Sequence, residues 1–291
     1  MRYTLSIALA AVIGSAVALH ADVPKVVTDF GPIDSLVQQV MGDLGKPVML
    51  LPAGGDPHDF QMRPSQAAAL SAADLVFWDG PELMPSLADA ITTLGEDSKV
   101  VALLHRGGGT TRNYTGDAGI DPHAWLDPVN AQAWLGTIAV ELAMIDPENA
   151  ATYAANASAA QADVQALDAE LATLLAPVRD KPFVVFHDAL GHFADHFGLR
   201  VVGAIELGDA TAPSAARLVE IAGLLADAKA VCVFPEAGRD PKFIATVVEG
   251  SAVRIGGGQD VEGITLQPGP ALYGDLLRGL ATTLVDCLTE N

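Results

Sequence analysis

The stretch PENAATYAANASAAQADVQALDAELATLLAPV, residues 147–178, lies near the middle of the 291-residue chain and predicts one long helix. Asp146 suits the N-cap and Pro147 suits the first helical turn. Apolar residues repeat on one face at helical spacing, at Val164, Leu167, Leu171, Leu174, Leu175 and Val178. About 32 residues at ~1.5 Å each extend over ~48 Å, which is long enough for a strut between two lobes.

Short β-branched runs alternate with helical patterns on both sides of this stretch. Because the runs are almost continuously apolar, they favour parallel strands that are covered on both faces. We therefore expect an α/β fold of two lobes, each a four-stranded parallel sheet with flanking helices, joined by one long rigid helix. The expected domains are 22–144, the linking helix 145–180 and 181–291. The expected strands are 25–29, 47–51, 74–78, 99–103, 183–187, 200–204, 230–234 and 252–256.

The first 21 residues have the pattern of a cleavable secretory signal. Arg2 precedes an apolar run over 5–19, and small residues lie near the end of the run at Ala16, Ala18 and Ala21. The run is shorter than the ~20 residues that a membrane-spanning helix needs. Cleavage after Ala18 and cleavage after Ala21 both fit. Since no lipobox cysteine is present, a soluble periplasmic monomer is expected.

Charge and cysteine content narrow the function further. The formal net charge of −20 disfavours nucleic-acid binding, which needs a basic surface, and it attracts cations. The two cysteines, Cys232 and Cys287, form no CxxC redox motif. In an exported protein they can form a disulfide, which would close a loop of about 55 residues and stabilise the fold by roughly 4 kcal/mol. Two buried free thiols are the alternative.

Three histidines lie at or after the carboxyl ends of expected strands. They are His58 in GGDPHDF, His123 in DPHAWLD and His187 in VVFHDALGHF. Open α/β sheets bind ligands at that edge, so a ligand that contacts all three would lie between the lobes. A histidine at a strand end can equally be a structural hydrogen-bonding residue.

A fourth donor is expected from the segment after the last strand, where Asp260 lies on the same edge. Three imidazoles and one carboxylate suit tetrahedral Zn(II), whereas manganese prefers more oxygen ligands. Four protein ligands leave no position for a catalytic water, which favours metal capture over catalysis. Glu236 also lies at this edge, either as a substitute ligand or as an acceptor for an imidazole N–H.

Two other histidine arrangements are weaker metal candidates. His192 and His196 are four residues apart on an expected helix and share a face. The HExxH protease motif needs a glutamate after the first histidine, and this chain has Phe193 there. His105 opens the glycine-rich loop 106–119 and is a candidate surface contact for metal.

The segments around these histidines resemble those of the cluster A-I solute-binding proteins, the periplasmic zinc and manganese receptors of ABC importers. The resemblance extends over about residues 24–289 and is most specific in DPHAWLDPVNA. It implies metal ligation by His58, His123 and His187, and the cysteine pair is similar to that of several zinc members. The segments concerned are PHDFQMRPS, DPHAWLDPVNA, FHDALGHFADHFGL and VFPEAGRDPK.

The chain departs from this family at two places. The turn after the last strand reads GGGQDVEG, so Glu262 is the nearest rival to Asp260 as the fourth ligand. The loop before the DPH motif has a single histidine, His105, where many zinc members have a histidine-rich loop. Metal delivery by a periplasmic zinc metallochaperone is one explanation.

The leading hypothesis is a periplasmic high-affinity zinc receptor, not an enzyme, that delivers Zn(II) to the membrane permease of an ABC importer. A manganese or iron receptor of the same fold is the first alternative. A secreted zinc hydrolase, with Glu236 as the general base, is the second. A metal-linked surface adhesin is a further class, which no specific motif supports.

Overall fold

Two parallel four-stranded sheets form the framework of the protein in a computed structural model, which describes residues 23–114, 119–206 and 213–289. The strand orders are β2-β1-β3-β4 and β6-β5-β7-β8, so both sheets have the same topology. The predicted fold class is confirmed, and each expected strand is present. The strands are β1 Val26–Thr28, β2 Val48–Met49, β3 Leu75–Trp78, β4 Lys99–Ala102, β5 Phe183–His187, β6 Val201–Glu206, β7 Cys232–Phe234 and β8 Arg254–Ile255.

Helices cover the sheets and connect successive strands, as parallel pairing requires. In the first lobe they are α1 Gly31–Met41, α2 Pro64–Ser71, α3 Pro85–Leu94, α4 Leu103–Arg106 and α5 Pro128–Ile145. In the second they are α7 Gly191–Phe197, α8 Ala215–Asp227, α9 Lys242–Val248 and α10 Leu272–Thr289. Short 3-10 turns occur at η1 Gly42–Leu44, η2 Pro57–Asp59 and η3 Ala124–Leu126.

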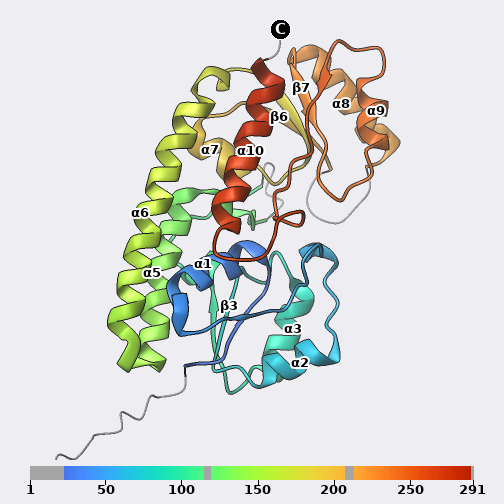
Figure 1. Cartoon of the computed structure of the whole chain (residues 1–291). Coiled ribbons are helices and arrows are strands. Elements are labelled where there is room, and N and C mark those ends of the chain that lie inside the picture. The colour runs from blue at the N-terminus through green and yellow to red at the C-terminus, as the bar shows by residue number, and fades with distance from the viewer. Residues whose placement is uncertain (1–22, 115–118, 207–212, 290–291) are drawn as a thin grey trace, which may run out of the picture.

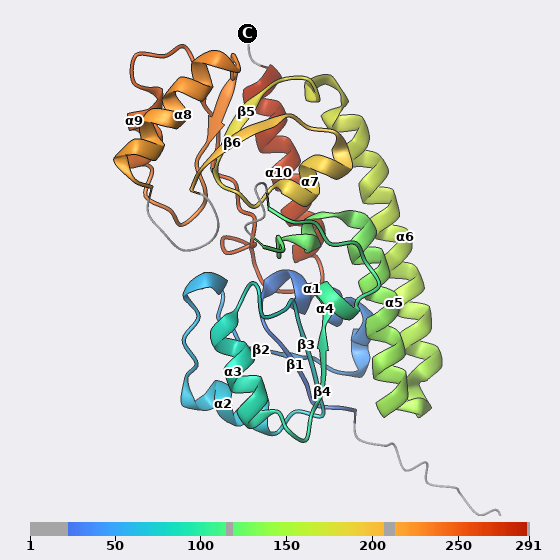
Figure 2. The same cartoon turned by 180° about the vertical axis from the view of Figure 1, so that it is seen from behind.

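The predicted strut is helix α6, Ala150–Leu175, which lies beside α5 and runs along one side of both lobes (Figures 1 and 2). The 3-10 turns η4, Pro147–Asn149, and η5, Ala176–Val178, extend it at its two ends. The Asp146 carboxylate accepts a hydrogen bond from the Asn149 backbone N–H, as expected of an N-cap.

A single apolar cluster runs through both lobes and the strut. It includes Leu36 of α1, Leu171 of α6, Phe183 of β5 and Leu280 of α10, all of them buried. A smaller cluster around Ile221 lies between the second sheet and helices α8 and α9. Because the first sheet, the strut and α10 share one core, a large hinge opening would expose apolar surface from both lobes.

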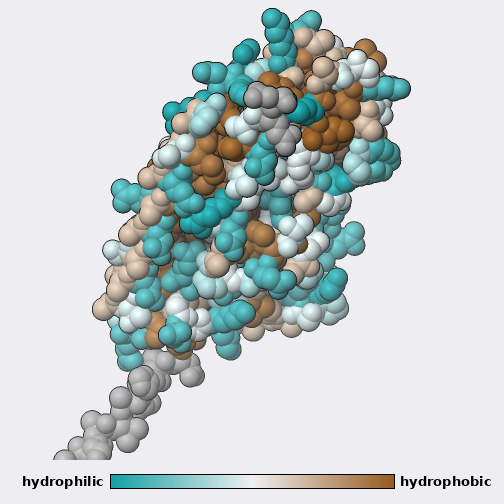
Figure 3. All heavy atoms as spheres, turned by 45° about the horizontal axis from the view of Figure 1, so that its top comes forward, coloured by the Kyte–Doolittle hydropathy of each residue, from teal (hydrophilic) through white to brown (hydrophobic). Residues whose placement is uncertain are grey.

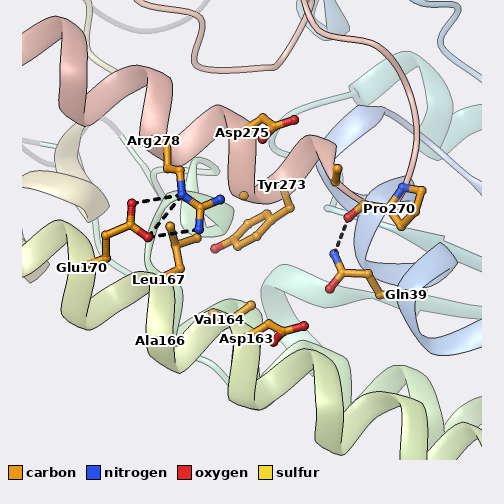
Figure 4. A pocket seen from close by; sticks show the side chains of 12 residues that line it. Gln39, Asp163, Val164, Ala166, Leu167, Glu170, Pro270, Tyr273, Asp275 and Arg278 are labelled. Carbon is orange, nitrogen blue, oxygen red and sulfur yellow. Dashed lines mark hydrogen bonds and ion pairs between the residues drawn. The ribbon is translucent and has the colours of Figure 1, made fainter.

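Helix α10 of the second lobe contacts both the strut and the first lobe at a groove of about 350 Å³ (Figure 4). There the Arg278 guanidinium of α10 pairs with the Glu170 carboxylate of α6 at 3.1 Å. The side-chain amide of Gln39, on α1, donates a hydrogen bond to the Pro270 carbonyl at 3.0 Å. The groove walls therefore come from α1, α6 and the start of α10; because the Arg278–Glu170 ion pair is about half exposed, it contributes little to the contact between the lobes.

The predicted disulfide is present between Cys232 of β7 and Cys287 of α10. Both residues are buried, and their sequence separation is 55. The bond attaches the last helix to the second sheet.

His196 of α7 links the second lobe to the strut and to α5. Its Nδ1 lies 3.1 Å from Asp127, the N-cap residue of α5, and its Nε2 lies 2.7 Å from Asp168 of α6. Hydrogen bonding to Asp127, and then to Asp168, raises the pKa of His196 to about 9. The protonated imidazole therefore joins three helices.

This geometry predicts a pH-dependent contribution of His196 to stability. Because the folded-state pKa is raised, the contribution is complete below the unfolded pKa of about 6.5 and is lost as the pH rises through about 9. Because solvent screens this partly exposed pair, His196→Ala in metal-free protein should lower the free energy of unfolding by only roughly 1–2 kcal/mol near pH 6 and by much less near pH 10. Urea unfolding at both pH values measures this. A His105→Ala control should show only a small loss, and an equal His196→Ala effect at both pH values would contradict the assignment.

In the part of the chain that the structure describes, no helix is both long and apolar enough to cross a membrane. Figure 3 shows hydrophilic residues over much of one face, with the larger groups of hydrophobic residues in the upper part of the view. The predicted signal sequence, with both cleavage positions and His20, lies outside the described residues.

Candidate metal centre

His58 reaches the cleft from the 3-10 turn η2, which follows the edge strand β2. Asp56 precedes this turn, and its carboxylate accepts a hydrogen bond from the His58 backbone N–H at 2.9 Å. Pro57 occupies the first position of the turn, where its fixed φ is favourable. The Asp-Pro-His triplet therefore determines the backbone position from which the imidazole projects.

His123 is held by a second Asp-Pro-His triplet, before η3. The Asp121 carboxylate accepts hydrogen bonds from the His123 backbone N–H at 3.0 Å and from its ring Nδ1–H at 2.8 Å. Because a carboxylate only accepts, Nδ1 carries the proton and Nε2 presents its lone pair. The His123 side chain is fully buried, and Nε2 has no hydrogen-bond partner among the described residues.

His187 is the last residue of the central strand β5 and enters the cleft from the second lobe. Its Nδ1–H donates to the Glu236 carboxylate at 3.1 Å, so its Nε2 is also left as the lone-pair nitrogen. Glu236 follows β7, and its side chain is almost fully buried. Glu236 therefore lies where a hydrogen-bond acceptor for the His187 N–H is expected, and not among the side chains that could ligate a metal.

The fourth side chain beside the three imidazoles is Glu262, not Asp260. The Asp260 carboxylate accepts hydrogen bonds from the backbone N–H groups of Ile264 and Thr265, at 2.8 and 2.9 Å, and from the Thr265 hydroxyl. Its acceptor capacity is thus used within the 260–265 turn. The structure thus brings Glu262, the rival residue, to the three imidazoles, whereas Asp260 lies in the turn beside them.

One hydrogen bond and one glycine turn place the segment that carries Glu262 in the cleft. The Trp125 indole N–H, from the first lobe, donates to the Val261 carbonyl at 2.9 Å. Gly263 then turns the chain with φ of +74°, which a residue with a Cβ rarely adopts. The Glu262 carboxylate is buried and lies 3.4 Å from His58 Nε2.

The four side chains form one compact group. A ligand atom from each of His58, His123, His187 and Glu262 lies within 4.8 Å of the others. The ring centroids of His123 and His187 are 4.9 Å apart, and those of His58 and His187 are 5.4 Å apart. Tetrahedral zinc with bonds of about 2.0–2.1 Å separates its donors by roughly 3.4 Å, so a contraction of at most about 1.4 Å between any two donors closes the shell.

Electrostatics at the two supporting carboxylates favour the ionised form. Burial alone would raise the pKa of Asp121, but hydrogen bonding from His123 brings that pKa below its usual value. The same holds for Glu236: burial alone would raise its pKa, but the hydrogen bond from His187 brings the pKa of Glu236 below its usual value. Both carboxylates therefore accept from their imidazoles and increase the basicity of the opposite nitrogen.

The remaining histidine candidates lie outside this group. His105 pairs with Glu82 at 2.9 Å at the surface. The His192 Nε2–H donates to the Asp121 carbonyl at 3.2 Å, whereas His196 contacts Asp127 and Asp168. The two helical histidines are used in separate structural contacts.

Two arginines that the sequence reasoning missed cross between the lobes behind the site. Arg239 pairs with Asp56, before His58, at 3.1 Å and with Glu236, behind His187, at 3.4 Å. Arg112 pairs with Asp121 at 2.7 Å and with Asp195 of α7 at 2.9 Å. The repeated Asp-Pro-His triplet was an available signal for the two aspartates, but no local pattern identifies the arginines.

Comparison with known proteins assigns the family. The profile "Zinc-uptake complex component A periplasmic" (ZnuA) matches residues 26–287. The high-affinity zinc uptake system protein ZnuA of Paracoccus denitrificans is 48% identical, with 97% of this chain and 98% of that protein covered. The manganese-binding lipoprotein MntA of Halalkalibacterium halodurans is 26% identical over 91% of this chain and 89% of its own.

Among solved structures, a zinc-bound 138–173 deletion mutant of ZnuA has a TM-score of 0.81 at 25% identity, covering 93% of this chain and all of its own. The family profile, the sequence relatives and the solved structure each match this chain over more than nine-tenths of the described residues or close to it, and all three point to the same family. The chain belongs to the ZnuA family of periplasmic zinc-uptake components.

Proposed function

We propose that this protein captures one Zn(II) between its lobes, with His58, His123, His187 and Glu262 as the ligands. The observation that carries the proposal is the convergence of four buried donors, two from each lobe, within 4.8 Å. A buried imidazole nitrogen without a partner, such as His123 Nε2, costs about 1–3 kcal/mol. A bound cation removes that cost.

The donor set favours zinc over manganese. Three imidazoles and one carboxylate suit a tetrahedral ion of intermediate softness, whereas Mn(II) prefers more oxygen donors and usually six ligands. Zinc also lies above manganese in the general order of affinity for such ligands. A manganese or iron receptor of the same fold remains the alternative that the metal titration distinguishes.

The geometry favours binding and release over catalysis. Four protein donors fill a tetrahedral shell and leave no position for an activated water, which a zinc hydrolase needs. Glu236, the general base that a hydrolase would use, is engaged by His187 and Arg239. We therefore propose a receptor without turnover of its own.

Membership of this family supports a role in transport. We propose that the protein is exported by the signal in residues 1–21, works as a monomer in the periplasm and delivers zinc to the membrane permease of an ABC importer. The scarcity of histidine in the loop after His105 supports loading by a periplasmic zinc metallochaperone. The proposed lobe boundaries remain 22–144 and 181–291, with 145–180 as the linking helix.

A competition titration tests the metal assignment. Protein stripped of metal is titrated with Zn(II) and, separately, with Mn(II) against a chromophoric chelator, and the bound metal is counted by elemental analysis. One zinc per chain, bound more tightly than manganese, is the expected result. Tighter binding of manganese, or zinc that the chelator removes completely at equal concentration, would contradict the proposal.

A further inference from the structure

Arg112 lies where the second lobe meets the residue that supports His123. Its Nη1 donates to Asp121 Oδ2 at 2.7 Å, while the other oxygen of Asp121, Oδ1, accepts from His123. The Asp121 backbone N–H also donates to the Arg112 carbonyl at 2.9 Å. Arg112 thus fixes the Asp121 carboxylate plane, and through it the direction of the His123 ring.

The same guanidinium rests on the start of α7 in the other lobe. Its Nε contacts Asp195 at 2.9 Å. A Cβ built on Gly191 would lie 1.5 Å from Arg112 Nη1, 2.4 Å from its Cζ and 2.7 Å from Asp121 Oδ2. Because Gly191 has no side chain, it leaves a recess in the surface of α7 that the Arg112 guanidinium fills. Since the closest obstructed group is the far end of a flexible side chain, an added methyl group would displace the Arg112 guanidinium first, and it would also press on the Asp121 carboxylate.

Asp121 receives a further contact from the same helix. His192, the residue after Gly191, donates from Nε2–H to the Asp121 carbonyl at 3.2 Å. Helix α7 therefore contacts the Asp121 backbone through His192. At Gly191 it also lies against one Asp121 carboxylate oxygen and against Arg112, the partner of that carboxylate. Contact between the lobes and the orientation of His123 depend on the same set of atoms.

We propose that Arg112 is a positioning residue for metal capture, seated in the Gly191 recess, which couples the orientation of His123 to the contact between the lobes. This inference rests on the proposed zinc site. Without Arg112, the Asp121 carboxylate is free to rotate away from His123 Nδ1, and one tie between the lobes is lost. Both effects act on a metal that is already bound, so zinc release should accelerate more than zinc association slows.

The test compares zinc release rates, measured by stopped flow with excess chelator, for wild type, Arg112→Ala and Gly191→Ala. Removing the hydrogen-bonding partners of ligands costs about 10–100-fold in metal affinity, so we expect release to be faster by about that factor in both variants. In Gly191→Ala no side chain is removed, and alanine favours a helix over glycine. Its metal-free thermal stability should therefore stay close to wild type.

Three controls separate positioning from general damage. Gly223→Ala places a methyl group where nothing lies within 4 Å, and Arg278→Ala removes an arginine from an ion pair remote from the site. Both should release zinc at the wild-type rate. Arg112→Lys keeps the charge but cannot bridge two carboxylates with one planar group, so its rate should lie between those of wild type and Arg112→Ala.

The double variant gives the sharpest result. Because the closest clash of Gly191→Ala falls on Arg112, adding it to Arg112→Ala should change the release rate much less than it changes that of wild type; the remaining change comes from the contact with Asp121. Fully additive effects, or wild-type release from Gly191→Ala, would overturn the inference while leaving the zinc site intact. A wild-type protein that retains no zinc would instead contradict the proposed function, and this inference with it.

The Co(II)-loaded proteins provide a readout that general destabilisation would not change. We expect the visible ligand-field bands of Arg112→Ala and Gly191→Ala to shift relative to wild type, since a reoriented His123 changes the coordination geometry. Unchanged bands in both variants would contradict a positioning role.

Discussion

Replacing His123 with alanine should weaken zinc binding by about 100-fold or more. Four-ligand zinc sites bind with roughly 10–16 kcal/mol, so one ligand accounts for about 3 kcal/mol, which corresponds to about two orders of magnitude in Kd. His123 is the most buried of the three histidines, and it receives its orientation from Asp121. Chelator competition with wild type and variant measures the change.

His105→Ala is the matched control for this prediction. That histidine pairs with Glu82 at the surface, outside the compact group, and its loss should leave the zinc Kd unchanged. An His123→Ala protein with wild-type affinity would remove this residue from the site.

Loss of the disulfide between Cys232 and Cys287 should have the largest effect on stability. Closing a loop of about 55 residues is worth roughly 4 kcal/mol in the chain-entropy model. For a protein of this size, that corresponds to a fall in Tm of about 10 °C. Calorimetry of the Cys232→Ser, Cys287→Ser double variant measures it. Because both sulfur atoms are buried at the β7–α10 contact, the second lobe should show most of the loss.

Reductant provides the internal control for the disulfide. It should lower the Tm of the wild type towards that of the double variant and leave the double variant itself unchanged. Equal Tm values for oxidised and reduced wild type would show that the bond contributes nothing to stability.

Much of the fold was predictable because hydrophobic pattern and local geometry agree. Strand β3 is buried in all four residues, as its continuous apolar sequence predicts, and the spacing from Val164 to Leu175 matches the buried face of α6. His187 ends a strand and His58 and His123 come after strand ends, and parallel strands bring such ends to one edge. Their convergence follows from topology, which the alternation of elements indicates.

Which of Asp260 and Glu262 lies beside the histidines could not be predicted in the same way. Asp260 and Glu262 are two residues apart in one turn, and the direction of each side chain depends on hydrogen bonds that form only in the folded chain. Asp260 closes the turn through Ile264 and Thr265, which leaves Glu262 to point into the cleft. Arg112 and Gly191 are nearly 80 residues apart, and only the assembled lobes bring them into contact.

Anomalous diffraction at the zinc absorption edge, from crystals of the zinc-loaded protein, locates the bound metal. We expect one strong anomalous peak per chain, in the cleft, within bonding distance of His58, His123, His187 and Glu262, with Asp260 still bonded to the 264–265 backbone. A principal peak coordinated by Asp260, or one that lies outside the cleft, would contradict the proposed zinc site.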